Sequence, residues 1–173
     1  MKLIFSSFLL FFATCCLSAQ SISVGGGIPY NVELDRLGLN ARGYYNIGKH
    51  FCFGPEYSIF LPKRETIGDE KKKLLVSEVN LNAHFIFEIN ELLAFYPLVG
   101  LNYTREFEKV TYLSDGRMES KGYNFYGANL GAGFHVALPK FVPFFEYEYV
   151  IGDLEEHIFI VGLFFNLSEE NEH

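Results

Sequence analysis

The alternation of apolar and polar residues between positions 79 and 89 does most to limit what this chain can fold into. The apolar members are Val79, Leu81, Ala83, Phe85, Phe87 and Ile89, and the polar ones are Glu78, Asn80, Asn82, His84 and Glu88. Successive side chains of a β-strand point to opposite faces, so this stretch predicts a strand with one dry face and one wet face. Because the same period returns along most of the chain after residue 20, we expect an all-β fold.

Eight segments carry this pattern, and they are predicted at 21–28, 36–45, 51–61, 75–89, 94–107, 123–138, 142–151 and 157–167. Several are longer than the roughly 5–6 residues usual in soluble sheets and match the roughly 9–11 residues of a tilted membrane strand. Longer polar connections are predicted as loops at 29–35, 62–73, 108–122 and 152–156, and they alternate with tight turns. Long loops at one end and short turns at the other are typical of transmembrane β-barrels.

Alternation alone fits both a membrane barrel and a secreted, lipocalin-like binder of a hydrophobic ligand. The two differ in which face of the strands points inward. Alternate positions of a strand lie on one face, and we call the set of positions on one face a parity. Most strand glycines share the parity of the polar residues, namely Gly25, Gly27, Gly38, Gly54, Gly100, Gly127, Gly131, Gly133 and Gly162. Glycine inside a strand marks crowding or close backbone approach, and an eight-stranded barrel has room inside only for side chains. We therefore predict an eight-stranded antiparallel up-and-down transmembrane β-barrel with its aromatic face outside. A few bulky residues break the rule by sharing the inward parity: Phe60, Phe125, Phe144, Ile160 and Phe164.

The two ends of the chain are predicted to lie outside the barrel. Lys2, the apolar run at 3–13 and the small residues before Gln20 predict a signal peptide at 1–19, which leaves a barrel at 20–167 and a polar tail at 168–173. The net charge of −7 argues against a nucleic-acid partner. Removal of the signal would leave Cys52 as the single cysteine, which excludes an internal disulfide.

The inward faces carry several ionisable residues, which we interpret as a structural polar network: Arg42, Glu56, Glu78, His84, His135, Glu146 and Glu148. Buried charges require partners, so we expect Arg42 to lie between Glu56 and one of Glu78, Glu146 or Glu148, and the network to plug the lumen. The alternative is a narrow, cation-preferring pore, because rings of acidic side chains select cations where a lumen is open. No metal site, cofactor or catalytic residue is predicted.

The last predicted strand, with Gly162, Phe165 and Leu167, matches a Gly-x-x-apolar-x-apolar pattern. With the strand pattern, it makes the chain resemble the small eight-stranded outer-membrane β-barrels of Gram-negative bacteria, the porin-like or OmpA-type barrel superfamily. The resemblance implies outer-membrane localisation, contact with membrane lipid and lipopolysaccharide, and recognition of these three residues by the barrel assembly machinery.

Two roles follow from this resemblance. The first is non-enzymatic: envelope integrity, or recognition of an extracellular partner through the loops at 62–73 and 108–122, where the charged run 69–73 is either a solvated loop or a contact for phosphate groups. The second is a lipid-A-modifying enzyme, for which Ser58 and Ser77 are the candidate nucleophiles. No His-x-Ser motif supports that alternative, so we expect no enzymatic activity.

Overall fold

The computed structural model describes residues 20–166 and consists of strands and their connections. The strands are β1 (Gln20–Asn31), β2 (Arg36–Ile47), β3 (Phe51–Phe60), β4 (Lys63–Ile67), β5 (Glu70–Phe85), β6 (Phe87–Glu88), β7 (Leu93–Tyr112), β8 (Met118–Val136), β9 (Val142–Gly152) and β10 (Glu156–Asn166). No helix among these residues is long and apolar enough to cross a membrane. The predicted signal peptide, the predicted tail and Leu167 lie outside the described residues.

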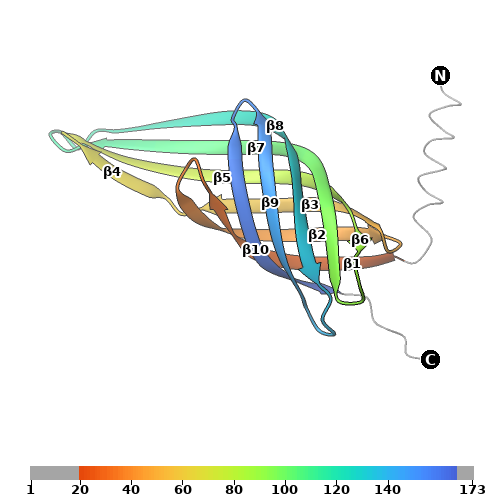
Figure 1. Cartoon of the computed structure of the whole chain (residues 1–173). Helices are drawn as coiled ribbons and strands as arrows, with labels where there is room; N and C mark the ends of the chain where they lie inside the picture. Colours follow the sequence, from red (N-terminus) through yellow and green to blue (C-terminus); the bar gives the residue numbers. More distant parts are fainter. Residues whose placement is uncertain (1–19, 167–173) are drawn as a thin grey trace, which may run out of the picture.

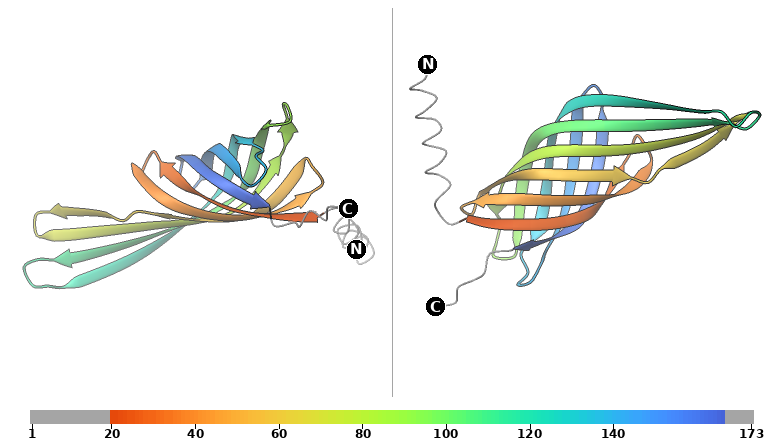
Figure 2. Two further views of the ribbon diagram at one scale, coloured as in Figure 1. Left: turned by 90° about the horizontal axis from the view of Figure 1, so that it is seen from below. Right: turned by 180° about the vertical axis from the view of Figure 1, so that it is seen from behind.

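Eight of the strands form a closed antiparallel barrel in the order β1-β2-β3-β5-β7-β8-β9-β10 (Figures 1 and 2). The barrel closes where β1 pairs with β10, in a register that sets Gly27 opposite Gly162. The two remaining strands are short additions, because β4 pairs with β5 and β6 pairs with β7. The predicted fold class, an eight-stranded antiparallel up-and-down transmembrane β-barrel, is therefore confirmed.

The two faces of the wall differ in the way that the sequence predicts. Large apolar side chains such as Leu39, Leu101 and Tyr126 are each 65% exposed on the outside of the barrel. Most buried residues on the opposite parity are polar or charged, and the interior glycines make room for them. A Cβ at Gly133, for example, would overlap the ring of Tyr96.

Two of the predicted loops are wrong, because residues 62–73 and 108–122 are largely β-structure. β5 begins at Glu70 and pairs first with β4, then with β3 from Ser77 onward. β7 continues to Tyr112 and β8 begins at Met118, and these two strands pair beyond the point where β8 leaves β9. The result is a four-stranded extension of the barrel, made of residues 63–67, 70–76, 106–112 and 118–123, which we call the paddle. It projects well beyond the rest of the barrel in Figures 1 and 2.

Hydrophobic alternation in the sequence does not predict the strands of the paddle. Beyond Leu75, charged and polar residues such as Lys71 and Lys73 replace the apolar ones at the outward positions. The backbone of the paddle nevertheless continues the ladder of the barrel without interruption, as the unbroken β5–β7 register from His84 to Glu70 shows.

Candidate functional site

The centre of the lumen is organised by one arginine. Arg42 on β2 places Nη2 2.8 Å from Oε2 of Glu56 and Nη1 2.8 Å from Oε1 of Glu146, and all three side chains are fully buried. Glu56 is the register partner of Arg42 on the neighbouring strand, whereas Glu146 comes from β9, three strands away around the wall. The guanidinium also lies over the ring of Phe144, 4.5 Å from its centroid. Arg42 therefore bridges the lumen from one side to the other.

Buried amides extend this ion pair into a network. Nε of Arg42 donates to Oδ1 of Asn40 over 2.7 Å. The Nδ2 atom of Asn82 donates to Oε1 of Glu56 and to Oε1 of Glu148, each over 2.7 Å. These contacts spread the carboxylate charge over several donors, as a buried charge requires.

Aromatic side chains complete the network on the side of the short turns. The hydroxyl of Tyr96 donates to Oε2 of Glu146 over 3.0 Å, and the hydroxyl of Tyr44 donates to Oε1 of Glu56. The ring of His84 lies against both tyrosines, and it is nearly parallel to that of Tyr96, with centroids 4.7 Å apart. These three rings form a layer between the carboxylates and the end of the barrel that carries the short turns.

Not every residue of the predicted network joins it. Glu78 is buried, but its carboxyl group interacts with that of Glu156 rather than with Arg42, so it is not the second partner of the arginine. His135 lies at the mouth of the lumen, where its ring is 5.7 Å from that of Tyr96. Sequence reasoning did not single out Asn40, Asn82, Tyr44 or Tyr96, although all four share the inward parity of Arg42.

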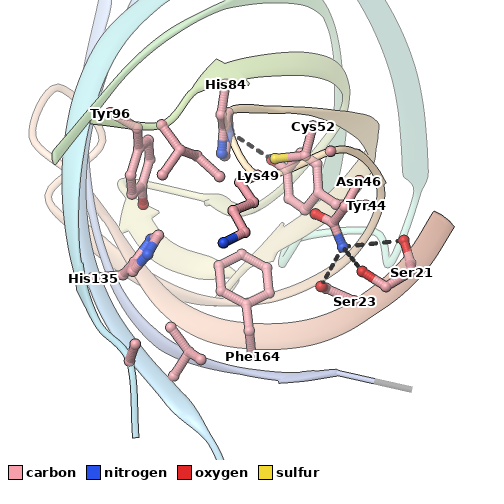
Figure 3. A pocket seen from close by; sticks show the side chains of 14 residues that line it. Ser21, Ser23, Tyr44, Asn46, Lys49, Cys52, His84, Tyr96, His135 and Phe164 are labelled. Atoms are coloured by element: carbon pink, nitrogen blue, oxygen red, sulfur yellow. Dashed lines mark hydrogen bonds between the residues drawn. The ribbon is translucent and has the colours of Figure 1, made fainter. Parts of the chain in front are cut away.

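A pocket of about 240 Å³ opens below this layer, at the end of the barrel that carries the short turns (Figure 3). Tyr44, His84 and Tyr96 line it and also belong to the network, so the pocket ends where the network begins. Figure 3 shows Lys49 reaching toward its middle. On one wall, Nδ2 of Asn46 donates to the hydroxyls of Ser21 and Ser23, and the buried thiol of Cys52 faces the same space.

Three carboxylates come close enough together to be considered as cation ligands. One oxygen from each of Glu56, Glu146 and Glu148 lies within 4.8 Å of the others. Such an all-oxygen set suits a hard cation. Two of the three carboxylates, however, are already paired with the guanidinium of Arg42, which supplies the positive charge at this point.

The two candidate nucleophiles lie on opposite faces of the wall. Ser58 is buried in the lumen and its hydroxyl accepts a hydrogen bond from Nδ2 of Asn40 over 2.9 Å. Ser77 shares the outward parity of Val79 and pairs with Ile59. Within residues 20–166 neither serine is hydrogen-bonded to a histidine.

The predicted assembly signal lies at the closing seam. Gly162 on β10 is packed against the backbone of Gly26 and the ring of Phe144, so a side chain there would collide with both. Phe165 faces outward with 47% of its surface exposed. The third predicted member, Leu167, is not among the described residues.

Comparison with known proteins supports the fold. No protein-family model and no curated protein sequence matches the chain. Among solved structures, the chain is similar to Ail, the attachment invasion locus protein of Yersinia pestis, with a TM-score of 0.58 and 18% identity over 86% of this chain and 97% of that one. A major outer membrane protein from Thermus thermophilus gives a TM-score of 0.68 at 11% identity, covering 86% of this chain and 100% of that one.

The N-terminal β-barrel domain of Pseudomonas aeruginosa OprF is a further match, with a TM-score of 0.56 and 17% identity over 85% of this chain and 97% of that one. At these identities the likeness establishes the architecture alone. That architecture is the small β-barrel of bacterial outer membranes, as the resemblance in the sequence implies.

Proposed function

We propose that this chain is an integral outer-membrane barrel with a closed lumen, and that it acts through its outer surface and its paddle rather than as a channel or an enzyme. The single observation that carries this proposal is the Arg42 network. It joins side chains from opposite sides of the wall by contacts of 2.7–3.0 Å and leaves them buried. An eight-stranded barrel is just wide enough to be filled in this way.

The height of the apolar surface fits insertion in a bilayer. Ten residue steps separate Phe85 from Leu75 along the outward parity of β5. At about 3.3 Å per residue and a tilt of about 40°, they rise about 25 Å, which is the height of the lipid-facing band of outer-membrane barrels. The aromatic side chains that would fill a lipocalin-like cavity lie on the outside of this wall instead.

A test of the closed lumen compares ion conductance with folding. The refolded barrel should migrate differently on a gel before and after heating, and should give no stepwise current in a planar bilayer in which a general porin conducts. Cation-selective steps from the folded protein would overturn the closed lumen and favour the narrow, cation-preferring pore. Loss of the heat-dependent migration would overturn the membrane barrel itself.

The surface role rests on the paddle, which carries four strands away from the bilayer. We propose that it serves envelope integrity or recognition, and that Ail, which its name describes as an attachment and invasion protein, provides a precedent on the same fold. Contact with lipid and lipopolysaccharide belongs to this proposal, as does insertion by the barrel assembly machinery through Gly162, Phe165 and Leu167.

A lipid-A-modifying activity would appear as a mass change in lipid A on expression, and its loss in Ser58→Ala would support that alternative.

A further inference from the structure

The charges of the paddle are sorted between its two faces. We define the outward face as the one that continues the lipid-facing side of the barrel. Together with Arg105, which lies immediately before the paddle on β7, its charged residues are all basic within the described chain: Arg64, Lys71, Lys73, Arg105 and Lys109. This sorting stands against the net charge of −7 for the chain, so it is not a consequence of composition.

The acidic residues lie on the inward face, together with lysines that neutralise them. Lys63 Nζ lies 2.8 Å from Oε1 of Glu65, and Lys72 Nζ lies 3.2 Å from Oε2 of Glu70. The first of these pairs lowers the pKa of Glu65 and the second raises the pKa of Lys72, as expected for opposite charges in contact. Among residues 20–166, none of the five outward cations has a carboxylate within 4.0 Å.

Three of the outward cations form a row across the sheet. Arg64 on β4 is the register partner of Lys73 on β5, which is the register partner of Lys109 on β7. Neighbouring strands are about 4.8 Å apart, and like charges directly opposite one another destabilise a sheet. The row, with Lys71, Lys72 and Thr111, lines a surface pocket of about 280 Å³, although the ammonium group of Lys72 is paired with Glu70 on the inward face. A bound anion would bridge these cations and remove the repulsion.

The row lies at a defined height above the apolar band. Leu75 and Phe107 are register partners and form the last apolar pair on the outward face; four of the five outward cations lie beyond this pair, and Arg105, opposite Ser77, lies on its barrel side. Lys73 and Lys109 follow two residues further along each strand, which places them about 5 Å beyond the band at the tilt used above. The headgroup layer begins at this level, because a bilayer extends about 5–7 Å beyond its hydrocarbon core on each side.

We propose that the outward face of the paddle binds the phosphate groups of lipid headgroups in the leaflet that surrounds it, with Arg64, Lys73 and Lys109 as the principal contacts. In an outer membrane those phosphates belong to lipopolysaccharide. This inference rests on the proposed membrane insertion and adds the chemistry of the partner to it. It also gives the charged run 69–73 a specific geometry, because Lys71 and Lys73 face the headgroups and Lys72 does not.

The test compares two triple variants with the same loss of charge. Arg64→Gln/Lys73→Gln/Lys109→Gln removes the outward row, and Lys63→Gln/Lys72→Gln/Lys121→Gln is the inward control. Each full-length barrel is reconstituted in phosphatidylcholine vesicles with a trace of spin-labelled phosphatidic acid, and the fraction of immobilised label gives the preference over spin-labelled phosphatidylcholine. Heat-dependent gel migration verifies that each protein is folded and inserted.

We expect the wild-type preference for phosphatidic acid to fall at least fivefold in the outward variant, about what one cation contributes near an anionic surface, and to stay unchanged in the control. Higher salt should weaken the wild-type preference as well. An equal fall in both variants, or no wild-type preference, would overturn the proposal.

A second arm separates lipid from soluble anions. In detergent solution, the outward face is tested for binding of inositol hexakisphosphate and heparin. If either binds while the vesicles show no headgroup preference, the row is a site for a soluble polyanion and the lipid contact is refuted. If the wild-type barrel itself fails to insert, the proposed function fails, and that outcome is visible in the gel before any lipid is measured.

Discussion

Replacing Arg42 by methionine should destabilise the barrel more than any exposed charge substitution. Methionine keeps most of the volume but leaves Glu56 and Glu146 without the guanidinium that each contacts at 2.8 Å. Both carboxylates are fully buried, so water cannot replace the lost partner. Removing one member of a buried ion pair costs about 3–5 kcal/mol, because the remaining charge is uncompensated.

The size of the effect can be worked out further from the network. A loss of about 3–5 kcal/mol lowers the folding equilibrium constant by roughly two to three and a half orders of magnitude. Replacing the arginine together with its two ion-pair partners, as in Arg42→Met/Glu56→Gln/Glu146→Gln, should recover part of the loss, since neither carboxylate that contacted the guanidinium is then left charged, while the buried Glu148 keeps its hydrogen bond from Asn82. The recovery distinguishes electrostatic imbalance from a simple packing defect.

The measurement is urea unfolding in lipid vesicles, followed by far-ultraviolet circular dichroism and heat-dependent gel migration, because the chain has no tryptophan. Arg117→Met is the matched control: it removes an exposed arginine whose ion pair with Glu119 is 3.8 Å long, and should change the free energy of unfolding by less than about 1 kcal/mol. If Arg42→Met unfolds at the same urea concentration as Arg117→Met, or if the triple variant is less stable than the single one, the reasoning about the lumen is wrong.

Three further substitutions or probes test other parts of the fold. Leu130→Arg places a charge on the lipid-facing wall at a cost of about 2–4 kcal/mol and should block membrane assembly, whereas Lys72→Gln should not, and equal membrane yields would contradict the assigned outer face. Gly133→Ala should cost about 1–3 kcal/mol because its Cβ overlaps a buried tyrosine ring, whereas Gly43→Ala, with open space around its Cβ, should be tolerated in the same unfolding assay. Cys52 is 5% exposed and should react with a water-soluble maleimide far more slowly in the folded barrel than in urea, and equal rates would contradict the burial of its thiol in the wall of the pocket.

The architecture follows from the sequence because its signal repeats in every strand. Parity alone identified the inward position of Arg42, Glu56 and Glu146, and it also assigned inward positions to the bulky exceptions Phe60 and Phe144, both of which are buried. The choice of Glu146 as the second partner of Arg42 could not be made in the same way. The two residues are 104 positions apart, and their meeting depends on the stagger between strands that are not neighbours.

The paddle shows the opposite case, in which a strand signal is lost although the strand continues. Hydrophobic alternation marks a strand only where one face is dry, and from Lys73 toward Ile67 neither face is. Charge sign alternates only along β7, where Arg105 and Lys109 lie on one face and Glu106 and Glu108 on the other, whereas residues 70–73 on β5 read Glu-Lys-Lys-Lys. Reading charge with the same period as hydrophobicity would therefore have extended β7 but not β5.

One strand register therefore determines both the depth of insertion and the chemistry at the membrane boundary. Along β7 the outward parity changes from Leu101 and Tyr103, through Arg105 and Phe107, to Lys109, without a break in the ladder. A shift of one residue would exchange the faces, turning Glu108 toward the headgroups and Arg105 into the lumen. Both changes are unfavourable at once, since an acid would meet phosphate and a new cation would need a buried partner. The charged part of each strand thus favours the same register as the apolar part.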